Sequence, residues 1–236
     1  MEQFTAIVLS AGRGSRMKSE QPKQYMDLNG KPVIYYALKA FEDSEVSSIV
    51  LVVGEGDEEY AKTEIVERYG FRKVKAIVPG GKERYQSVYE GLKAAKGADF
   101  VLVHDGARPM IDQKILQRAM NCVRETKACV VAMPVKDTIR VVARDRKTES
   151  TPQRETLWAM QTPQCFSYNL IMGAYSHLYA DQAAGKYIPT ITDDAMVVEY
   201  GIGTPSTMVE GSYRNIKITT PEDLEVARAF LKSQAD

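Results

Sequence analysis

The sequence predicts an α/β fold, a single Rossmann-like domain of three layers with a mostly parallel sheet. Two observations carry this prediction. Short apolar runs alternate along the chain with amphipathic segments of about 10–15 residues, which is typical of βαβ units. The first apolar run, at residues 6–9, leads directly into a loop of small residues. Glycine and other small residues at such a strand end let the backbone approach a ligand closely.

Apolar runs bounded by turn residues give the expected strands, at residues 6–9, 48–53, 74–78, 100–103, 128–135, 207–209 and 216–219. Segments with helical patterning give the expected helices, at residues 31–41, 57–69, 85–95, 113–125, 167–181, 193–200 and 221–232. Residues 31–41 illustrate that patterning, with Pro32 near the start and apolar residues at three- and four-residue steps. The last helix has Pro221 at its first position and acidic residues in its first turn, which complement the helix dipole.

The pattern changes after Val135. Residues 137–142 and part of 151–158 alternate polar and apolar side chains, and a charged turn at 144–150 separates them. We interpret residues 137–158 as a protruding β-arm on one domain that spans residues 1–236. Because an isolated two-stranded hairpin is marginal in water, it should pack on something. A second copy of the chain, giving a homodimer, is one partner; the other interpretation folds the arm back on its own domain.

Composition excludes several classes of protein. Lys plus Arg and Asp plus Glu both number 31, whereas a nucleic-acid-coating protein is expected to be basic. Three cysteines without a C-x-x-C pair suit a reducing cytosol, and two histidines do not favour a zinc site. No apolar run approaches the roughly 20 residues that span a bilayer, and the start of the chain lacks a basic signal region. We expect a cytoplasmic protein that engages neither nucleic acid nor membrane.

The loop after the first strand is the strongest functional signal. It begins with the small residues Ser10, Ala11 and Gly12, continues through Gly14, and carries several cations. The cations are Arg13, Arg16, Lys18 and Lys23. Concave rows of backbone N–H groups favour anions, and fixed cations beside them suit a polyphosphate. We therefore hypothesise that this loop holds the triphosphate of a nucleotide.

Two better-known phosphate motifs do not fit this loop. A dinucleotide fingerprint requires Gly or Ala where this chain has Met17, and a P-loop requires a Gly-Lys-Ser/Thr run that is absent from the sequence. An ordinary basic strand-to-helix turn remains the alternative. Pro22 favours the functional interpretation, because it stiffens the segment that carries Lys23.

Two further loops follow expected strands and meet the first at the carboxyl edge of the sheet, where open α/β sheets bind ligands. In the first of these, Gly80 and Gly81 permit close backbone approach, and Ser87 offers a hydrogen bond to a base edge; a tight βα turn is the alternative. In the second, Asp105 ends a buried strand and Arg108 follows it. A carboxylate there suits Mg²⁺ on a polyphosphate, and an Asp105–Arg108 ion pair is the alternative.

Four later residues also enter the argument. Arg154 lies on the β-arm, and Lys217 lies between two isoleucines, so that its side chain points either to a site or to water. Asp193 and Asp194 are alternative metal ligands, although they also make a good helix N-terminus, which we favour.

The motifs occur in one order along the chain. They are AGRGSRM at 11–17, PKQ at 22–24, GG at 80–81 with Arg84, SV at 87–88, VHDGARP at 103–109, VKDTI at 135–139, LW at 157–158, QTPQ at 161–164, TDDA at 192–195, NIK at 215–217 and PEDL at 221–224. In this order the sequence resembles the 2-C-methyl-D-erythritol 4-phosphate cytidylyltransferase family over about residues 5–231. The family's fold and homodimer agree with the expectations above.

The resemblance implies a role for each matching position. Arg16 and Lys23 match cations that stabilise the transition state, and Arg154 and Lys217 match residues that position the second substrate. Positions that match the nucleotide site are Ser10, Ala11, Gly12, Gly14, Gly81, Ser87, Asp105 and Gly106. Positions that match the site for the second substrate's phosphate are Arg108, Thr138, Arg154 and Lys217. Asp105 matches the carboxylate near a divalent cation, expected to be Mg²⁺. Two positions depart from the family pattern, since Ser10 stands where relatives often have Pro or Ala, and Gly106 where many have Ala.

The implied reaction joins CTP and methylerythritol phosphate into a CDP-alcohol and pyrophosphate. The acceptor phosphate has a second pKa near 6, so it is largely ionised at neutral pH and needs no general base. Other functions stay open from sequence alone. They are a ribitol 5-phosphate cytidylyltransferase, a nucleotide-sugar pyrophosphorylase and a non-catalytic nucleotide-binding module, which a pyrophosphate-release assay with different acceptors separates.

Overall fold

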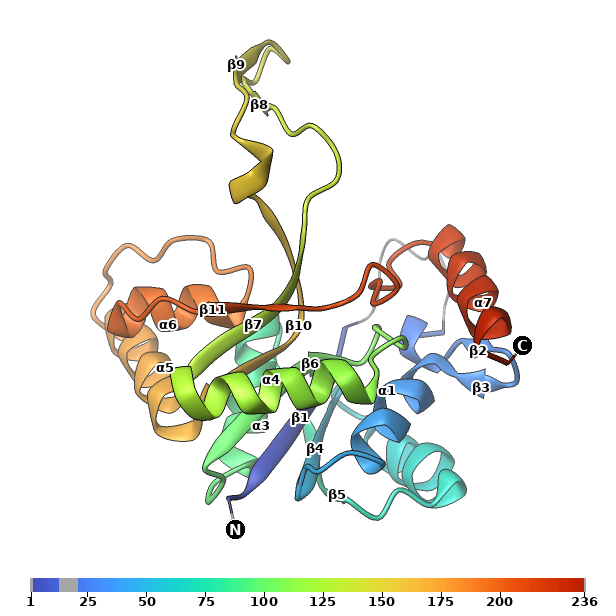
Figure 1. Cartoon of the computed structure of the whole chain (residues 1–236). Helices are drawn as coiled ribbons and strands as arrows, with labels where there is room; N and C mark the ends of the chain where they lie inside the picture. Colours follow the sequence, from blue (N-terminus) through green and yellow to red (C-terminus); the bar gives the residue numbers. More distant parts are fainter. Residues whose placement is uncertain (1, 13–20, 236) are drawn as a thin grey trace.

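The computed structural model describes residues 2–12 and 21–235, with the side chains of residues 234 and 235 left out. Gly14 and Arg16, two of the predicted site residues, lie outside the described residues, as do Arg13 and Lys18. Figure 1 shows a central sheet with helices on both faces and a long extension that leaves the body of the molecule.

The main sheet has seven strands in the order β11-β7-β10-β6-β1-β4-β5. All neighbours run parallel except that β10 runs antiparallel to both β6 and β7. The strands are β1 (Phe4–Ser10), β4 (Ser48–Val53), β5 (Val74–Pro79), β6 (Phe100–Asp105), β7 (Ala128–Pro134), β10 (Trp158–Ser167) and β11 (Thr207–Glu210). The predicted α/β class and mostly parallel sheet are therefore confirmed.

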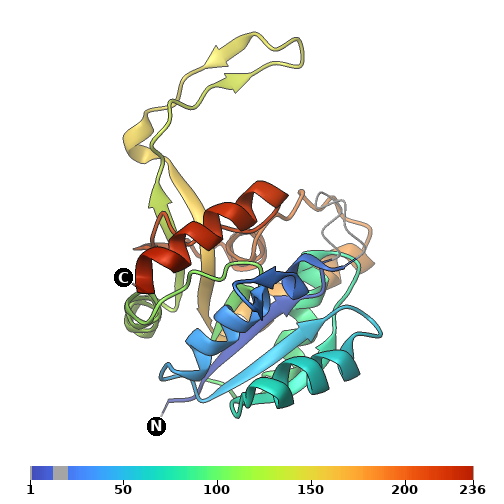
Figure 2. The same ribbon diagram turned by 90° about the vertical axis from the view of Figure 1, so that its right-hand side faces the viewer.

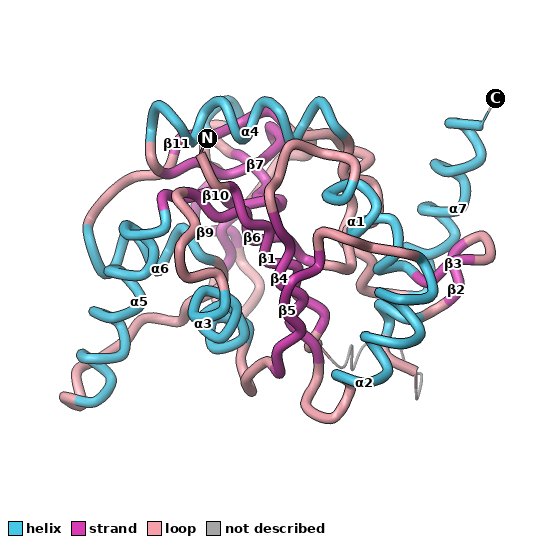
Figure 3. The backbone as a smooth tube through the Cα atoms, turned by 90° about the horizontal axis from the view of Figure 1, so that it is seen from below, coloured by secondary structure: helices cyan, strands magenta, loops and turns pink. Residues whose placement is uncertain are grey.

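Helices cover the two faces of this sheet, and each face has its own apolar core (Figure 3). One face carries α1 (Val33–Glu42), α2 (Glu58–Tyr60) with the π-helical η3 (Ala61–Glu67), and α4 (Gln113–Thr126). The other carries α3 (Arg84–Ala94), α5 (Tyr168–Ala183) and α6 (Asp194–Ile202). The result is the predicted three layers. A smaller cluster packs α7 (Pro221–Ala235) against β2 (Asp27–Leu28) and the start of α1, and β3 (Lys31–Pro32) pairs with β2.

The structure corrects the prediction at β10, which was not recognised as a strand of the main sheet. Pro163 argues against a central strand because proline cannot donate to the ladder. Here the register of β10 shifts between Met160 and Gln164, so Pro163 falls in the irregular stretch, where no ladder bond is needed.

The predicted strand at residues 216–219 is wrong. The alternation is real, since Ile218 is fully buried in the small cluster and Lys217 faces the other way, toward Asp105. Among the described residues the segment nevertheless has no ladder partner: the Ile218 N–H donates to the carbonyl of Ala107 at 2.8 Å. Polar and apolar side chains alternate here because one side of an extended segment is buried. The alternation does not mean that the segment is a strand of a sheet.

Residues 135–157 project from the body between β7 and β10 (Figures 1 and 2). They contain a two-stranded sheet, but its strands are β8 (Val141–Val142) and β9 (Thr148–Ser150). The second strand thus falls in the stretch predicted as a turn, and residues 154–156 of the predicted second strand form a short 3₁₀ helix, η4. Val141 and Val142 are exposed within the isolated chain. Within the described residues, no helix is long and apolar enough to cross a membrane.

Candidate functional site

One cleft collects the predicted loops at the carboxyl edge of the sheet. It opens beside β1, where the strand order reverses between β4 and β6. Its lining includes eight of the predicted site residues, namely Ser10, Ala11, Gly12, Lys23, Gly81, Ser87, Asp105 and Lys217. Lys23 and Asp105 therefore share one cleft, as the nucleotide hypothesis requires.

The first two loops touch each other across the cleft. A Cβ at Gly80 would lie 2.6 Å from both the Ala11 Cβ and the Ser87 Oγ, so only glycine lets the loops approach this closely. The Gly81 N–H donates to Ser87 Oγ at 3.1 Å, which fixes the loop to the start of α3. Ser87 thus has a structural partner, and its contact with a nucleotide base stays a prediction.

Gly106 is constrained by packing as well. A Cβ at this position would collide with Ile34 Cδ1 and lie 2.8 Å from the carbonyl oxygen of Leu9. That same carbonyl accepts a hydrogen bond from the Gly106 N–H at 2.8 Å. The ends of β1 and β6 are therefore held together directly at the cleft.

Asp105 is held between two cations. Arg84 Nε lies 3.1 Å from its Oδ1, and Lys217 Nζ lies 2.7 Å from its Oδ2. Burial alone would raise the pKa of Asp105, but the charges of Arg84 and Lys217 outweigh burial and hold it well below its ordinary range. The carboxylate is therefore ionised at any physiological pH.

Arg108 does not form the ion pair with Asp105 that was the alternative interpretation of this loop. Its Nη1 donates to the carbonyl of Asn215 at 2.7 Å, and its Nη2 donates to the carbonyl of Met160 at 3.4 Å. Arg108 thereby joins the loop after β6 to the segment that carries Lys217. The sequence left two directions open for the side chain of Lys217, a site or water. In the structure it lines the cleft and contacts Asp105.

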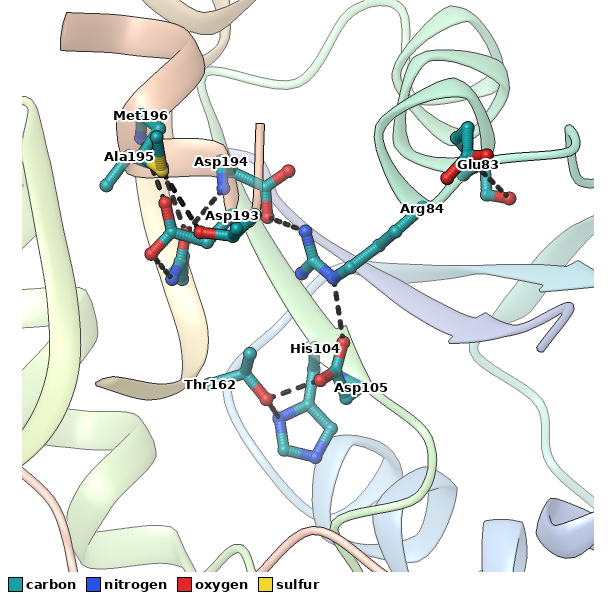
Figure 4. Close-up of polar contacts among 12 residues, drawn as sticks. Glu83, Arg84, His104, Asp105, Thr162, Asp193, Asp194, Ala195 and Met196 are labelled. Carbon is teal, nitrogen blue, oxygen red and sulfur yellow. Dashed lines mark hydrogen bonds and ion pairs between the residues drawn. The ribbon is translucent and has the colours of Figure 1, made fainter. Parts of the chain in front are cut away.

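Arg84 reaches a second carboxylate behind the cleft (Figure 4). Its Nη1 lies 2.9 Å from Asp194 Oδ2, and Asp194 is completely buried. Burial lowers the pKa of Arg84, but the carboxylates of Asp194 and Asp105 outweigh this effect and raise it above the ordinary value. The predicted helix start is confirmed, because Asp193 caps α6 by accepting from the Met196 N–H at 3.0 Å.

His104 forms a relay beneath the same loop (Figure 4). The Asp105 N–H donates to Thr162 Oγ1 at 3.1 Å, and Thr162 Oγ1 lies 3.0 Å from His104 Nδ1. His104 Nε2 lies 3.1 Å from the Arg108 carbonyl, which can only accept. The hydrogen-bond network therefore assigns the proton to Nε2 and makes Nδ1 the acceptor of the Thr162 hydroxyl.

Thr138 and Arg154 lie apart from this cleft. Both are exposed on the projecting segment, and Arg154 Nη1 donates to the carbonyl of Lys136 at 3.3 Å. Neither residue is among those that line the cleft within this chain.

The described residues contain no group of three His, Cys, Asp or Glu side chains arranged to hold a metal ion. Asp105 can still serve as a single ligand. Each of its oxygens uses one lone pair on a cation and keeps another, and Mg²⁺ typically takes one or two carboxylates together with phosphate oxygens and water.

Sequence reasoning missed part of the site. Arg84 was quoted only as part of a motif, and Thr162, Gln24 and the burial of Asp194 carried no separate signal. Gln24 is buried and donates from Nε2 to the carbonyl of Ser10, which fixes the end of β1. The only available hint was that Gln24 lies within the motif PKQ and Thr162 within the motif QTPQ.

The fold and the cleft together define an α/β nucleotidyltransferase. A family model described as 2-C-methyl-D-erythritol 4-phosphate cytidylyltransferase matches residues 4–233. The chain belongs to this family. Proteins of that name from Lachnoclostridium phytofermentans and Lachnospira eligens are 50% identical over 236 residues and 52% identical over 229 residues. These matches cover 100% and 97% of this chain and 99% of each relative.

Solved structures agree with the sequence relatives. A crystal structure of 4-diphosphocytidyl-2C-methyl-D-erythritol synthase from Anaerococcus prevotii superposes with a TM-score of 0.84 at 32% identity, covering 98% of this chain and 96% of that one. A 2-C-methyl-D-erythritol 4-phosphate cytidylyltransferase from Thermus thermophilus gives a TM-score of 0.76 at 27% identity, covering 98% and 100%. The ribitol alternative is not favoured by these relatives.

The His104 relay predicts a pH dependence of stability. Burial lowers the pKa of His104 from 6.5 to about 4, so the unfolded chain binds a proton there before the folded chain does. The free energy of unfolding should therefore fall as the pH falls from about 6.5 to about 4, by roughly 3 kcal/mol from this group. Urea unfolding across this window measures it. His104→Gln should flatten the slope, whereas His177→Gln on the surface of α5 should keep it; equal slopes for all three proteins would contradict the assignment.

Proposed function

We propose that this chain transfers a cytidylyl group from CTP to 2-C-methyl-D-erythritol 4-phosphate. An oxygen of the acceptor phosphate attacks the α-phosphorus of CTP and forms the new P–O bond. The bond from the α-phosphorus to the bridging oxygen breaks, and pyrophosphate leaves with the bonding electrons. The observation that carries this proposal is the convergence of Lys23, Lys217 and Asp105 in one cleft of a chain from this family.

The nucleotide side of the cleft is proposed to comprise the three loops. Ser10, Ala11, Gly12, Gly81 and Ser87 line it with small side chains and backbone. Asp105 also lines it. Gly106, which follows Asp105, and Gly14 and Arg16, which lie outside the described residues, are proposed to belong to the same nucleotide site. Small residues here let N–H groups approach the triphosphate and sugar, while the lysines neutralise phosphate charge.

No general base is needed, and the histidines support this view. His104 is buried, and both its ring nitrogens are already engaged. His177 lies on α5, with Nε2 3.3 Å from Asp181 Oδ2, and neither histidine lines the cleft. The ionised acceptor phosphate supplies its own nucleophilic oxygen. Alignment of two anions and neutralisation at the α-phosphorus are then the main sources of rate.

Lys23, together with Arg16, is proposed to stabilise the charge that develops at the α-phosphorus. Asp105 would hold a divalent cation, expected to be Mg²⁺, with phosphate oxygens and water completing its ligands. Such a cation would supply further charge neutralisation on the triphosphate. Lys217 and Arg108 are proposed to hold the acceptor phosphate, since the hydrogen bond from Arg108 to the Asn215 carbonyl keeps the loop of Arg108 beside the segment that carries Lys217.

Thr138 and Arg154 are proposed to complete the acceptor site of a second subunit. We propose that residues 137–158 act as the arm of one domain spanning residues 1–236, and that two arms exchange across a homodimer. The exposed apolar side chains of Ile139, Val141 and Val142 support this, because an interface would cover them. Cys122, Cys129 and Cys165 are free thiols, which supports a reducing, cytoplasmic setting.

An acceptor assay tests the reaction. With CTP and Mg²⁺, pyrophosphate release should require methylerythritol phosphate and should be far slower with ribitol 5-phosphate or with sugar 1-phosphates. Parallel reactions with UTP measure nucleotide selectivity. Exclusive use of ribitol 5-phosphate would mean that the chain is a ribitol 5-phosphate cytidylyltransferase instead. CTP binding without pyrophosphate release for any acceptor would favour a non-catalytic nucleotide-binding module.

Lys23→Ala should lower kcat by roughly 100-fold or more, by analogy with the loss of a single oxyanion-hole donor. The reason is that the charge of Lys23 is proposed to act in the transition state. Lys93→Ala is the control: Lys93 lies on α3, half exposed and paired with Glu90 at 2.6 Å, away from the cleft lining. Near-normal kcat in Lys23→Ala would remove this lysine from the mechanism.

The arm exchange predicts complementation between two inactive variants. If Arg154 serves the partner's site, a mixed dimer of Arg154→Ala and Lys23→Ala subunits contains one site with both lesions and one with neither. Random 1:1 mixing after dissociation should then recover about one quarter of the wild-type activity, as two-fold symmetry requires. Activity that stays at the level of the separate variants would mean that Arg154 serves its own subunit.

A further inference from the structure

Asp194 is a buried carboxylate without a role in the reaction described above. It is the first residue of α6 and is completely buried, and it does not line the cleft. Its Oδ1 accepts from the hydroxyl of Tyr175 at 2.9 Å, and its N–H donates to Gln164 Oε1 at 2.9 Å. The cap of the helix is Asp193, so capping does not explain the second aspartate.

Arg84 lies between this carboxylate and the cleft. One guanidinium spans two carboxylates, with Nη1 2.9 Å from Asp194 Oδ2 and Nε 3.1 Å from Asp105 Oδ1 (Figure 4). A planar guanidinium that is fixed on two sides has one orientation. The direction in which Arg84 presents its Nε–H to Asp105 is therefore set from behind by Asp194.

We propose that Asp194 is a positioning residue: it orients Arg84, and through Arg84 it orients the Asp105 carboxylate that faces the nucleotide. This inference rests on the proposed function and says which residue keeps Arg84 and Asp105 oriented in the nucleotide site. A buried charge is costly, and leaving its partner unpaired costs more. With Asp194 neutralised, Arg84 loses one of two fixed contacts, and Asp105 is left with Lys217 as its remaining well-held cation.

Charge alone predicts the opposite outcome, which makes the inference testable. Arg84, Lys217, Asp105 and Asp194 form a quartet that carries no net charge when all four groups are ionised. Burial raises the pKa of Asp194, and the charge of Arg84 opposes that rise. Asp194→Asn adds one net positive charge next to an anionic nucleotide, so simple electrostatics would leave CTP binding unchanged or strengthen it. Loss of orientation would weaken it instead.

The test measures CTP binding by calorimetry, with Mg²⁺ and without acceptor, in Asp194→Asn, Arg84→Gln and the double variant. Tyr175→Phe is the matched control, because it removes the hydrogen bond to Asp194 Oδ1 and leaves the Arg84 contact intact. Asp194→Asn should weaken CTP binding roughly 10-fold, because Arg84 loses one of its two ion-pair contacts, and Tyr175→Phe should change it much less. Because Asp194 acts through Arg84, the double variant should match Arg84→Gln within about twofold.

A second measurement does not depend on nucleotide. The Nε–H signal of Arg84 in a ¹⁵N NMR spectrum, assigned by its loss in Arg84→Gln, should be protected from exchange in the wild type and in Tyr175→Phe but not in Asp194→Asn. If Asp194→Asn fails to fold, Arg84→Lys replaces it: one ammonium cannot span both carboxylates, so CTP binding should still fall.

Three results would overturn the proposal: wild-type CTP affinity in Asp194→Asn, wild-type affinity in Arg84→Lys, or losses that multiply in the double variant. A wild-type protein that binds no CTP would instead overturn the proposed function, and the NMR arm would still decide whether Asp194 fixes Arg84.

Discussion

The ionised carboxylate of Asp105, held by Arg84 on one oxygen and Lys217 on the other, is the interaction on which the site depends. A cleft that brings two anionic substrates together needs cations, and cations placed close together repel one another. Asp105 lets Arg84 and Lys217 share a small volume without that repulsion. The polar groups are consequently oriented before any substrate arrives, which is the condition under which electrostatic stabilisation costs no reorganisation.

The architecture of the sheet explains why this carboxylate sits where it does. β1 and β6 are parallel neighbours in which Leu9 lies opposite Asp105, so both strands end at the same level. β10 then inserts antiparallel beside β6 and supplies Thr162, which accepts from the Asp105 N–H. The side chain of Asp105 is therefore fixed by cations and its backbone by the relay through His104. An irregular strand next to the site gives it a hydroxyl that a regular ladder would not have provided.

The sequence was informative where chemistry is local and uninformative where it depends on distant pairing. Small residues after an apolar run identify the Ser10 loop without knowledge of its neighbours, and the βαβ alternation identifies the sheet. β10 was hidden because Pro163 reads as a strand breaker, and its tolerance depends on a register shift that arises only when β6 and β7 flank it. Asp194 looked like part of a helix cap, because nothing near it in sequence reveals that Arg84 would meet it across the core.

The contrast between local signals and distant pairing also applies to the charged residues of this molecule. Its overall balance of 31 basic and 31 acidic residues carries no information about the cleft, where Asp105 is held between Arg84 and Lys217. With all four groups ionised the quartet has no net charge, so the positive field that an anionic ligand would meet comes from cations outside it, such as Lys23 on the first loop and Lys82 on the second, both of which line the cleft. The two sets divide the work. The quartet supplies fixed directions, because Arg84 and Asp105 are each held by two oppositely charged partners. Lys23 and Lys82 add further cations to the lining of the cleft.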